Sequence, residues 1–226
     1  MVLRKTKEPQ YQIQIETVDE KGLVQLGLMT SHLWRSDPKH LGFLLSRYKF
    51  CAKLLSGRQK VLEVGCADGF GLSIVLQSVH AIHAVDFDPL FISNAREINK
   101  EHENVSFDVC DFTQTRPCET YDAIYSLDVI EHISDLDEKK FMCNIIDSLN
   151  SHGVCIIGTP NICASSHASV WSQQGHINMK DAVTLRKLLE EYFYNVFIFS
   201  MNDEVIHTGF FPMAHYLMAV CTEKKE

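Results

Sequence analysis

The sequence predicts an α/β protein: a doubly wound, mostly parallel sheet of seven strands whose last strand is antiparallel. Three observations predict this fold class. Short apolar segments alternate with helical segments along the chain, a glycine-rich turn follows the first apolar segment, and no helix separates the last two. Alternating strands and helices build a sheet with helices on its faces. Strands joined by a short loop can pair antiparallel.

Each predicted strand is a short run rich in apolar and β-branched residues. The first strand ends at a glycine, and the second and third end at aspartates. Only residues 202–213 separate the last two strands, so these can lie side by side in opposite directions. In chain order, the predicted strands are 61–64, 81–86, 105–110, 123–127, 153–158, 196–200 and 216–221.

The predicted helices alternate with these strands. The first has apolar residues at helical spacing from Leu41 to Leu55 and ends at Ser56-Gly57. A run of apolar residues after the glycine-rich turn forms the second, and Pro89 begins the third. In chain order, the predicted helices are 41–55, 72–76, 89–100, 138–149 and 180–193.

The chain divides into an N-terminal arm or cap, residues 1–40, and a single domain, residues 41–226. The YQIQI alternation at 11–15 indicates a short edge strand or an extended arm. Residues 159–178 show no clear period, and residues 202–213 are polar and aromatic. We expect these two segments to be the loops that line an acceptor pocket.

Composition excludes several classes of function. The 226 residues are 46% hydrophobic and 22% charged, which suits one globular domain with a large core. The formal net charge of −8 disfavours a nucleic-acid partner. The eight cysteines form no C-x-x-C pair, and no signal peptide or apolar run of about 18 residues is present. These features predict a soluble, cytoplasmic protein without membrane insertion; a homodimer is compatible with them.

The most informative segment is 61–71, VLEVGCADGFG. A strand that breaks through glycines into a helix lets the backbone approach a nucleotide at the carboxyl end of the strand. A dinucleotide fingerprint starting at Gly65 requires glycines two and five positions later, where this chain has Ala67 and Phe70. The spacing therefore disfavours an NAD-dependent oxidoreductase.

The pattern E-x-G-x-A-x-G, from Glu63 to Gly69, resembles the first motif of class I S-adenosylmethionine-dependent methyltransferases, with Ala67 in place of the usual middle glycine. The resemblance spans about residues 40–221. It implies a Rossmann-like methyltransferase fold and S-adenosyl-L-methionine (AdoMet) as the cofactor. In this family Glu63 would partly organise the turn.

Acidic residues at the strand ends complete the expected cofactor site. Asp86 follows the turn by about 20 residues, where a carboxylate can accept hydrogen bonds from both ribose hydroxyls. The resemblance implies that Asp111 contacts the adenine amine, and that Arg47 can pair with the methionine carboxylate. A surface role for this arginine fits the sequence equally well. The expected cofactor-binding residues are Glu63, Gly65, Ala67, Gly69, Asp86, Phe87, Asp111, Phe112, Leu127 and Arg47.

Methyl transfer to oxygen needs a group that removes a proton from the acceptor, and histidine is suited to that role. The segment 126–132, SLDVIEH, resembles the segment after strand four of ubiquinone-type O-methyltransferases and contains His132. His176 lies in a GHIN turn and His207 in the last loop. Each of the three could instead be structural. No H-x-x-x-H, H-E-x-x-H or close Cys/His spacing exists, so the sequence predicts no metal site.

The acceptor is predicted from what the chain has and lacks. Enzymes that methylate exocyclic amines of nucleic-acid bases usually carry a Pro-Pro turn after strand four, and this chain has no Pro-Pro. Methylation of cytosine C5 needs a nucleophilic cysteine, typically beside a proline near strand four, whereas Pro117-Cys118 lies in the connection between strands three and four. Both kinds of base methylation are therefore disfavoured. We expect an AdoMet-dependent methyltransferase acting on a hydroxyl of a small molecule. A sugar, nucleotide-linked or on a surface glycan, is preferred because Thr159-Pro160-Asn161 and the polar loops suit a hydroxyl-rich acceptor. The alternatives are a phenolic or quinone-like acceptor and a non-catalytic AdoMet-binding regulatory module.

Overall fold

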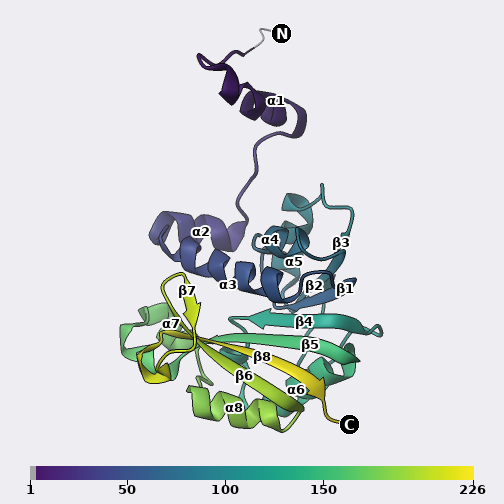
Figure 1. Ribbon diagram of the computed structural model, residues 1–226, viewed down its shortest axis with the longest axis vertical. Coiled ribbons are helices and arrows are strands. Elements are labelled where there is room, and N and C mark those ends of the chain that lie inside the picture. Colours follow the sequence, from purple (N-terminus) through teal and green to yellow (C-terminus); the bar gives the residue numbers. More distant parts are fainter. Residues whose placement is uncertain (1–3) are drawn as a thin grey trace.

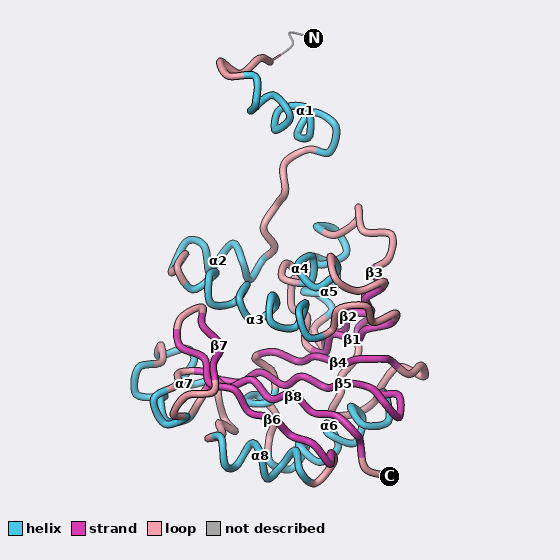
Figure 2. The backbone as a smooth tube through the Cα atoms, viewed as in Figure 1, coloured by secondary structure: helices cyan, strands magenta, loops and turns pink. Residues whose placement is uncertain are grey.

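The computed structural model describes residues 4–226 and shows one twisted eight-stranded sheet with helices packed on its faces (Figure 1, Figure 2). The strand order is β3-β2-β1-β4-β5-β8-β6-β7. The strands are β1 (Lys60–Val64), β2 (Ala81–Asp86), β3 (Val105–Val109), β4 (Tyr121–Leu127), β5 (Leu149–Pro160), β6 (Phe193–Asn202), β7 (Val205–His207) and β8 (Tyr216–Lys224).

The pairing confirms the predicted fold class and corrects the number of strands. The first five strands are parallel to one another, and β8 inserts antiparallel between β5 and β6. The eighth strand is β7, which pairs antiparallel with β6 within the segment 202–213 that we expected to be a loop. Three residues of intermediate or high exposure carry no apolar alternation, so the sequence does not reveal this strand.

Two hydrophobic clusters, one on each face of the sheet, hold the helices in place. The first includes side chains of α3, α4 and α5; the second includes side chains of α6 and α8. These two layers give the helix-covered sheet that the alternating pattern predicts. The helices are α1 (Gln12–Lys21), α2 (Leu28–Ser36), α3 (His40–Leu54), α4 (Leu72–Leu76), α5 (Pro89–Ile98), α6 (Asp135–Ser148), α7 (Val170–Gly175) and α8 (Ala182–Glu190).

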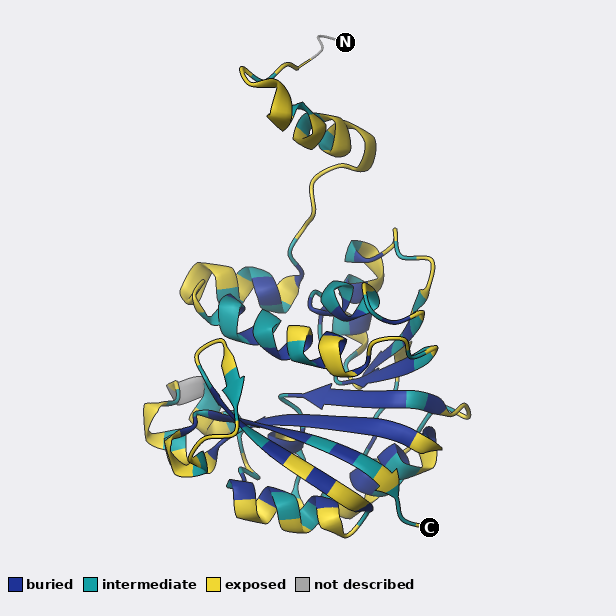
Figure 3. Cartoon of the chain, in the orientation of Figure 1, coloured by how far each residue is buried: buried dark blue, intermediate teal, exposed yellow. Residues whose placement is uncertain are grey.

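The N-terminal region contains an arm and a cap. Helix α1 has no buried residue and stands away from the sheet (Figure 3). The segment 11–15 is an arm but neither an edge strand nor extended: within residues 4–226 no sheet edge lies beside it, and its backbone groups find partners within a helix. Helix α2 packs against the core through Met29 and Leu33, and Thr30 donates two hydrogen bonds to the buried carboxylate of Asp68 in the glycine-rich turn, at 2.8 and 2.9 Å.

The two expected acceptor loops meet beyond the end of β5. The segment 159–178 contains a 3₁₀ helix, Ile162–His167, and the helix α7. The buried amide of Asn161 donates to the carbonyl oxygens of Phe211 and Ala214, at 2.8 and 2.9 Å, and so joins this segment to the loop after β7. Within the described residues, no helix is long and apolar enough to cross a membrane.

Candidate active site

The glycine-rich turn after β1 is held in a backbone conformation that its sequence permits. Gly65, Ala67 and Gly69 have φ values of 82°, 47° and 67°. A Cβ atom at Gly65 would lie 2.2 Å from Cγ2 of Val129, so this position accepts only glycine without movement of the neighbour. The turn therefore packs directly against the segment that follows β4.

Asp86, at the end of β2, is fixed by this turn. One carboxylate oxygen accepts a hydrogen bond from the backbone N–H of Ala67 at 2.9 Å, and the other accepts one from Asp88 at 3.0 Å. Each oxygen of a carboxylate has more than one lone-pair site. The carboxylate is thus held at one orientation and keeps capacity to accept hydrogen bonds from a ribose diol.

A cavity opens between the carboxyl ends of the first parallel strands. Asp111 on its wall accepts hydrogen bonds from the backbone N–H and hydroxyl of Thr113, at 2.8 and 2.6 Å. Phe87 is 72% exposed, whereas Phe112 is buried and packs edge-on against Phe141. The cavity is lined by Val64, Gly65, Asp86, Phe87, Cys110, Asp111, Phe112, Thr113, Val129, Ile133 and Phe141. Apolar walls with acidic acceptors suit an adenine ring and its ribose.

Glu63 lies beneath the turn rather than on the cavity wall. It is buried, and its two carboxylate oxygens accept hydrogen bonds from the hydroxyls of Tyr48 and Tyr125, at 2.9 and 2.8 Å. Burial raises the pKa of Glu63 to about 8. The ring of Tyr48 also packs on Gly71, where a Cβ would lie 2.2 Å away. The sequence indicates the organising role of Glu63 but does not identify these tyrosines as its partners, because they lie 15 and 62 positions away.

Arg47 and Leu127 have partners inside the protein. The Arg47 guanidinium donates to both carboxylate oxygens of Asp128, at 2.8 and 2.6 Å, and lies 3.7 Å from the ring centroid of Tyr216. The guanidinium that we expected to meet the methionine carboxylate is thus already paired with an acid of this chain. The side chain of Leu127 belongs to the hydrophobic core.

His132 and His176 come together beyond the end of β4, next to the buried Glu131. The two imidazole rings are 5.0 Å apart and edge-on. Nδ1 of His132 lies 2.9 Å from the carbonyl oxygen of Gly175, 43 positions away in the sequence. Because a carbonyl only accepts, Nδ1 donates in this contact, and in the neutral ring Nε2 then holds the lone pair.

Asn178 fixes the turn that places His176 here. Its backbone N–H donates to the carbonyl oxygen of Glu131 at 2.9 Å, and its side-chain amide donates to that of Ile133 at 3.0 Å. Burial lowers the pKa of His176, and the neighbouring His132 lowers it further. Burial and the charge of Asp128 raise the pKa of Glu131 to about 8.

His207 belongs to a separate hydrogen-bonded hairpin. Its Nε2 lies 3.0 Å from the amide oxygen of Asn202, and its Nδ1 accepts from the backbone N–H of Gly209 at 2.9 Å. Both ring nitrogens are engaged within β6, β7 and the loop that follows. The structure therefore brings together two of the three predicted catalytic histidines and leaves the third with internal partners.

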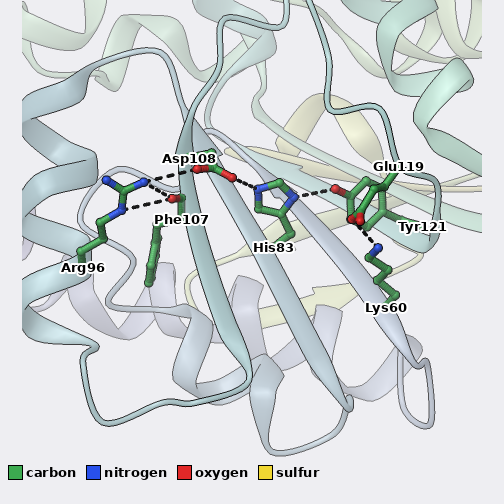
Figure 4. A network of polar contacts seen from close by, with 7 residues as sticks. All are labelled: Lys60, His83, Arg96, Phe107, Asp108, Glu119 and Tyr121. Carbon is green, nitrogen blue, oxygen red and sulfur yellow. Dashed lines mark hydrogen bonds and ion pairs between the residues drawn. The ribbon is translucent and has the colours of Figure 1, made fainter.

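A second polar network runs from the amino ends of β1 and β4 across β2 to Asp108 of β3 (Figure 4). His83 of β2 is 2.9 Å from Asp108 and 2.5 Å from the hydroxyl of Tyr121, and Lys60 pairs with Glu119. Ligands of such sheets bind at the carboxyl ends of the strands. Because its members satisfy one another and do not line the cofactor cavity, we place this network outside the candidate site.

Comparison with known proteins agrees with this geometry. The family described as methyltransferase domain matches residues 35–196. A probable S-adenosylmethionine-dependent methyltransferase of Mycolicibacterium smegmatis is 26% identical over 148 residues, 63% of this chain and 54% of the relative. The ubiquinone biosynthesis O-methyltransferase of Rickettsia felis is 23% identical over 162 residues, 65% of this chain and 64% of the relative. The chain thus spans between about half and two thirds of these relatives.

A solved structure shows the same fold. The N-methyltransferase NodS of Bradyrhizobium japonicum, in complex with S-adenosyl-L-homocysteine, has a TM-score of 0.64 and 19% identity, covering 84% of this chain and 91% of NodS. The predicted superfamily is confirmed. This chain belongs to the methyltransferase domain family, within the class I AdoMet-dependent methyltransferases, and its cofactor is S-adenosylmethionine.

Proposed function

We propose that the protein transfers the methyl group of AdoMet to a hydroxyl of a small molecule, with a sugar hydroxyl, nucleotide-linked or on a surface glycan, as the preferred acceptor. The observation that carries the proposal is the pair His132 and His176 beyond the end of β4. The same segment contributes Val129 and Ile133 to the cofactor cavity. This shared segment supports a position of the pair close to the methyl group of bound AdoMet.

Bound AdoMet supplies an electrophilic methyl group, so the protein must hold the acceptor and assist loss of its proton. In the neutral ring, Nε2 of His132 has a lone pair that can accept from a hydroxyl while Nδ1 donates to the carbonyl oxygen of Gly175. The lowered pKa of His176 keeps that ring neutral at pH 7. Asn178 holds the turn between them and acts as a positioning residue.

A phenolic ring is the second candidate acceptor. Ile162, Ile177, Phe210 and Met213, on the two predicted acceptor loops, are between 46% and 77% exposed. Exposed apolar side chains on such loops can contact an aromatic ring, and they can also contact the apolar face of a sugar. Thr159 and Asn161, on which the sequence-based preference for a sugar rests, are buried and bonded to Glu131, Phe211 and Ala214, so the product assay decides between the two acceptors.

The test is a product assay with the purified chain and isotope-labelled AdoMet against four acceptor classes: glycosides, nucleotide sugars, catechol-type phenols and primary amines. We expect a methyl ether on a saccharide and at least 100-fold lower turnover for His132→Ala, with unchanged affinity for S-adenosylhomocysteine. Methylation of phenols selects the second candidate. Methylation of amines alone contradicts oxygen transfer, and cofactor binding without any product indicates a regulatory module.

Cofactor binding is tested by Asp86→Ala. Loss of a carboxylate that bonds the ribose removes charge-assisted hydrogen bonds of about 1.5–3 kcal/mol each, so the affinity for S-adenosylhomocysteine falls by about 10–100-fold or more. Calorimetric titration measures this change. Asp147→Ala, at an exposed position of α6, is the matched control and keeps wild-type affinity. Equal affinities for the two variants would exclude Asp86 from the ribose site.

A further inference from the structure

Glu131, His132 and His176 form a cluster whose geometry the reaction above does not fully use. Their ligand-type atoms, one from each residue, all lie within 4.8 Å of one another. The three side chains come from the segment after β4 and from the turn after α7, so no short sequence motif reveals them. Asn178 holds the two segments together through the carbonyl oxygen of Glu131.

Two polar atoms of this cluster are buried without a partner. Oε2 of Glu131 accepts a hydrogen bond from the Thr159 hydroxyl at 3.1 Å, but Oε1 has none from any residue that the structure describes. Nδ1 of His176 is likewise buried and without a hydrogen bond within residues 4–226. A buried acceptor without a donor costs about 1–3 kcal/mol. Two such atoms in one cluster indicate a missing partner that binds both.

A cation suits the position of the missing partner. The Glu131 side chain is fully buried, and no ion pair joins it to a described residue. The nearby cation, Arg47, forms an ion pair with Asp128, whose carboxylate accepts two hydrogen bonds from its guanidinium. A buried carboxylate is stable when a cation or a metal compensates its charge.

The donor set identifies the class of cation. Two imidazoles and one carboxylate are the ligands that first-row divalent transition metals prefer, whereas Mg²⁺ and Ca²⁺ prefer oxygen ligands alone. His132 also shows the outer contact that is usual for a metal-ligating histidine, because its other ring nitrogen donates to the carbonyl oxygen of Gly175. Three protein ligands leave coordination positions open, and the exposed His132 places them toward solvent.

We propose that Glu131, His132 and His176 bind one divalent first-row transition metal ion, such as Zn²⁺, Mn²⁺ or Co²⁺, and that the open positions receive the acceptor hydroxyl. The metal site is argued from the cluster alone, whereas coordination of the acceptor hydroxyl rests on the proposed function. Coordination to the cation makes the hydroxyl more acidic and orients its oxygen. In this arrangement the remaining lone pair of His132 holds the cation rather than contacting the hydroxyl, so the hydroxyl proton leaves to water. The oxygen forms the bond to the methyl carbon, and the sulfonium sulfur keeps the electron pair of the broken carbon–sulfur bond.

The test is metal binding by the full chain, freed of metal with a chelator and titrated with Zn²⁺, Mn²⁺ or Co²⁺ alone. We expect one ion per chain by calorimetry, together with the visible absorption bands of Co²⁺ bound to nitrogen ligands. A saturating metal also raises the melting temperature of the wild type. Glu131→Gln, His132→Ala and His176→Ala weaken binding by at least tenfold. His207→Ala is the matched control and binds as the wild type does, because His207 bonds within its own hairpin.

Binding of S-adenosylhomocysteine by each variant shows that its fold is intact, and Glu131→Gln preserves the shape of the side chain. Absence of metal binding by the wild type at millimolar metal, or equal metal binding by the wild type and all three cluster variants, overturns the site.

The two proposals fail separately. Metal binding without methylation of any hydroxyl removes the proposed function and leaves the metal site, whereas hydroxyl methylation that continues after chelation removes the metal and leaves the function.

Discussion

At the scale of single residues, Glu63 shows how one acid supports the cofactor site without facing it. Its carboxylate is shielded from water beneath the turn and held by two tyrosine hydroxyls. Burial raises the pKa of Glu63 to about 8, and this effect outweighs the hydrogen bonds to the charged form, which lower the pKa. Protonation of this residue is therefore linked to folding.

The direction of that linkage predicts a pH dependence. The folded state keeps the Glu63 proton up to about pH 8, whereas the unfolded chain releases it near 4.5. The stabilisation is fully present below pH 4.5 and is lost as the pH rises through 8. We expect the free energy of unfolding of the wild type to fall between pH 5 and about 8.5, and to fall less steeply in Glu63→Gln.

Urea unfolding at several pH values measures this slope. Glu97→Gln, the same change at an exposed position of α5, serves as the control and keeps the wild-type slope. Parallel curves for wild type and Glu63→Gln would show that this carboxyl does not titrate with a shifted pKa.

The sequence predicts individual residues well where the backbone dictates them. Gly65 and Asp86 are recognisable because the turn needs a left-handed φ at one and a hydrogen-bond acceptor at the other. Arg47 illustrates the limit. Its position in the helix before β1 is visible in the sequence, but its pairing with Asp128, 81 positions away, depends on how the two elements pack.

At the scale of elements, the N-terminal segment shows that a local sequence pattern does not by itself decide the secondary structure. The alternation at 11–15 suits a strand, yet α1 forms because no strand lies beside it. Helix α2, a few residues later, is anchored by Thr30 on the buried Asp68. The two helices therefore contribute differently to stability.

This difference can be measured by deletion. Removing residues 1–24 takes away α1, which buries no residue, so we expect the melting temperature to change by less than about 2 °C. Removing residues 1–36 also takes away α2 and leaves Asp68 without its partner, so the melting temperature falls by several degrees. A large loss of stability in the shorter deletion would show that α1 packs against the domain.

At the scale of the whole molecule, the strand order brings the site together. The first two strands carry the glycine-rich turn and Asp86, and β4 lies beside β1, so the segment after β4 reaches the turn. The connection after β5 then returns across the same edge and delivers His176 to His132. One end of the sheet thus holds the cofactor cavity and the histidine pair.

The sequence by itself determined the fold class, the glycine-rich turn, and the acidic residues at the strand ends, because these depend on neighbours within a few positions. Strand periodicity, turn chemistry and helix boundaries are local properties of the chain. Only the tertiary structure decided that β7 is a strand, that Arg47 pairs with Asp128, and that Glu131 meets two histidines. Those contacts join residues far apart in sequence, and they exist only once the sheet has set which segments face each other.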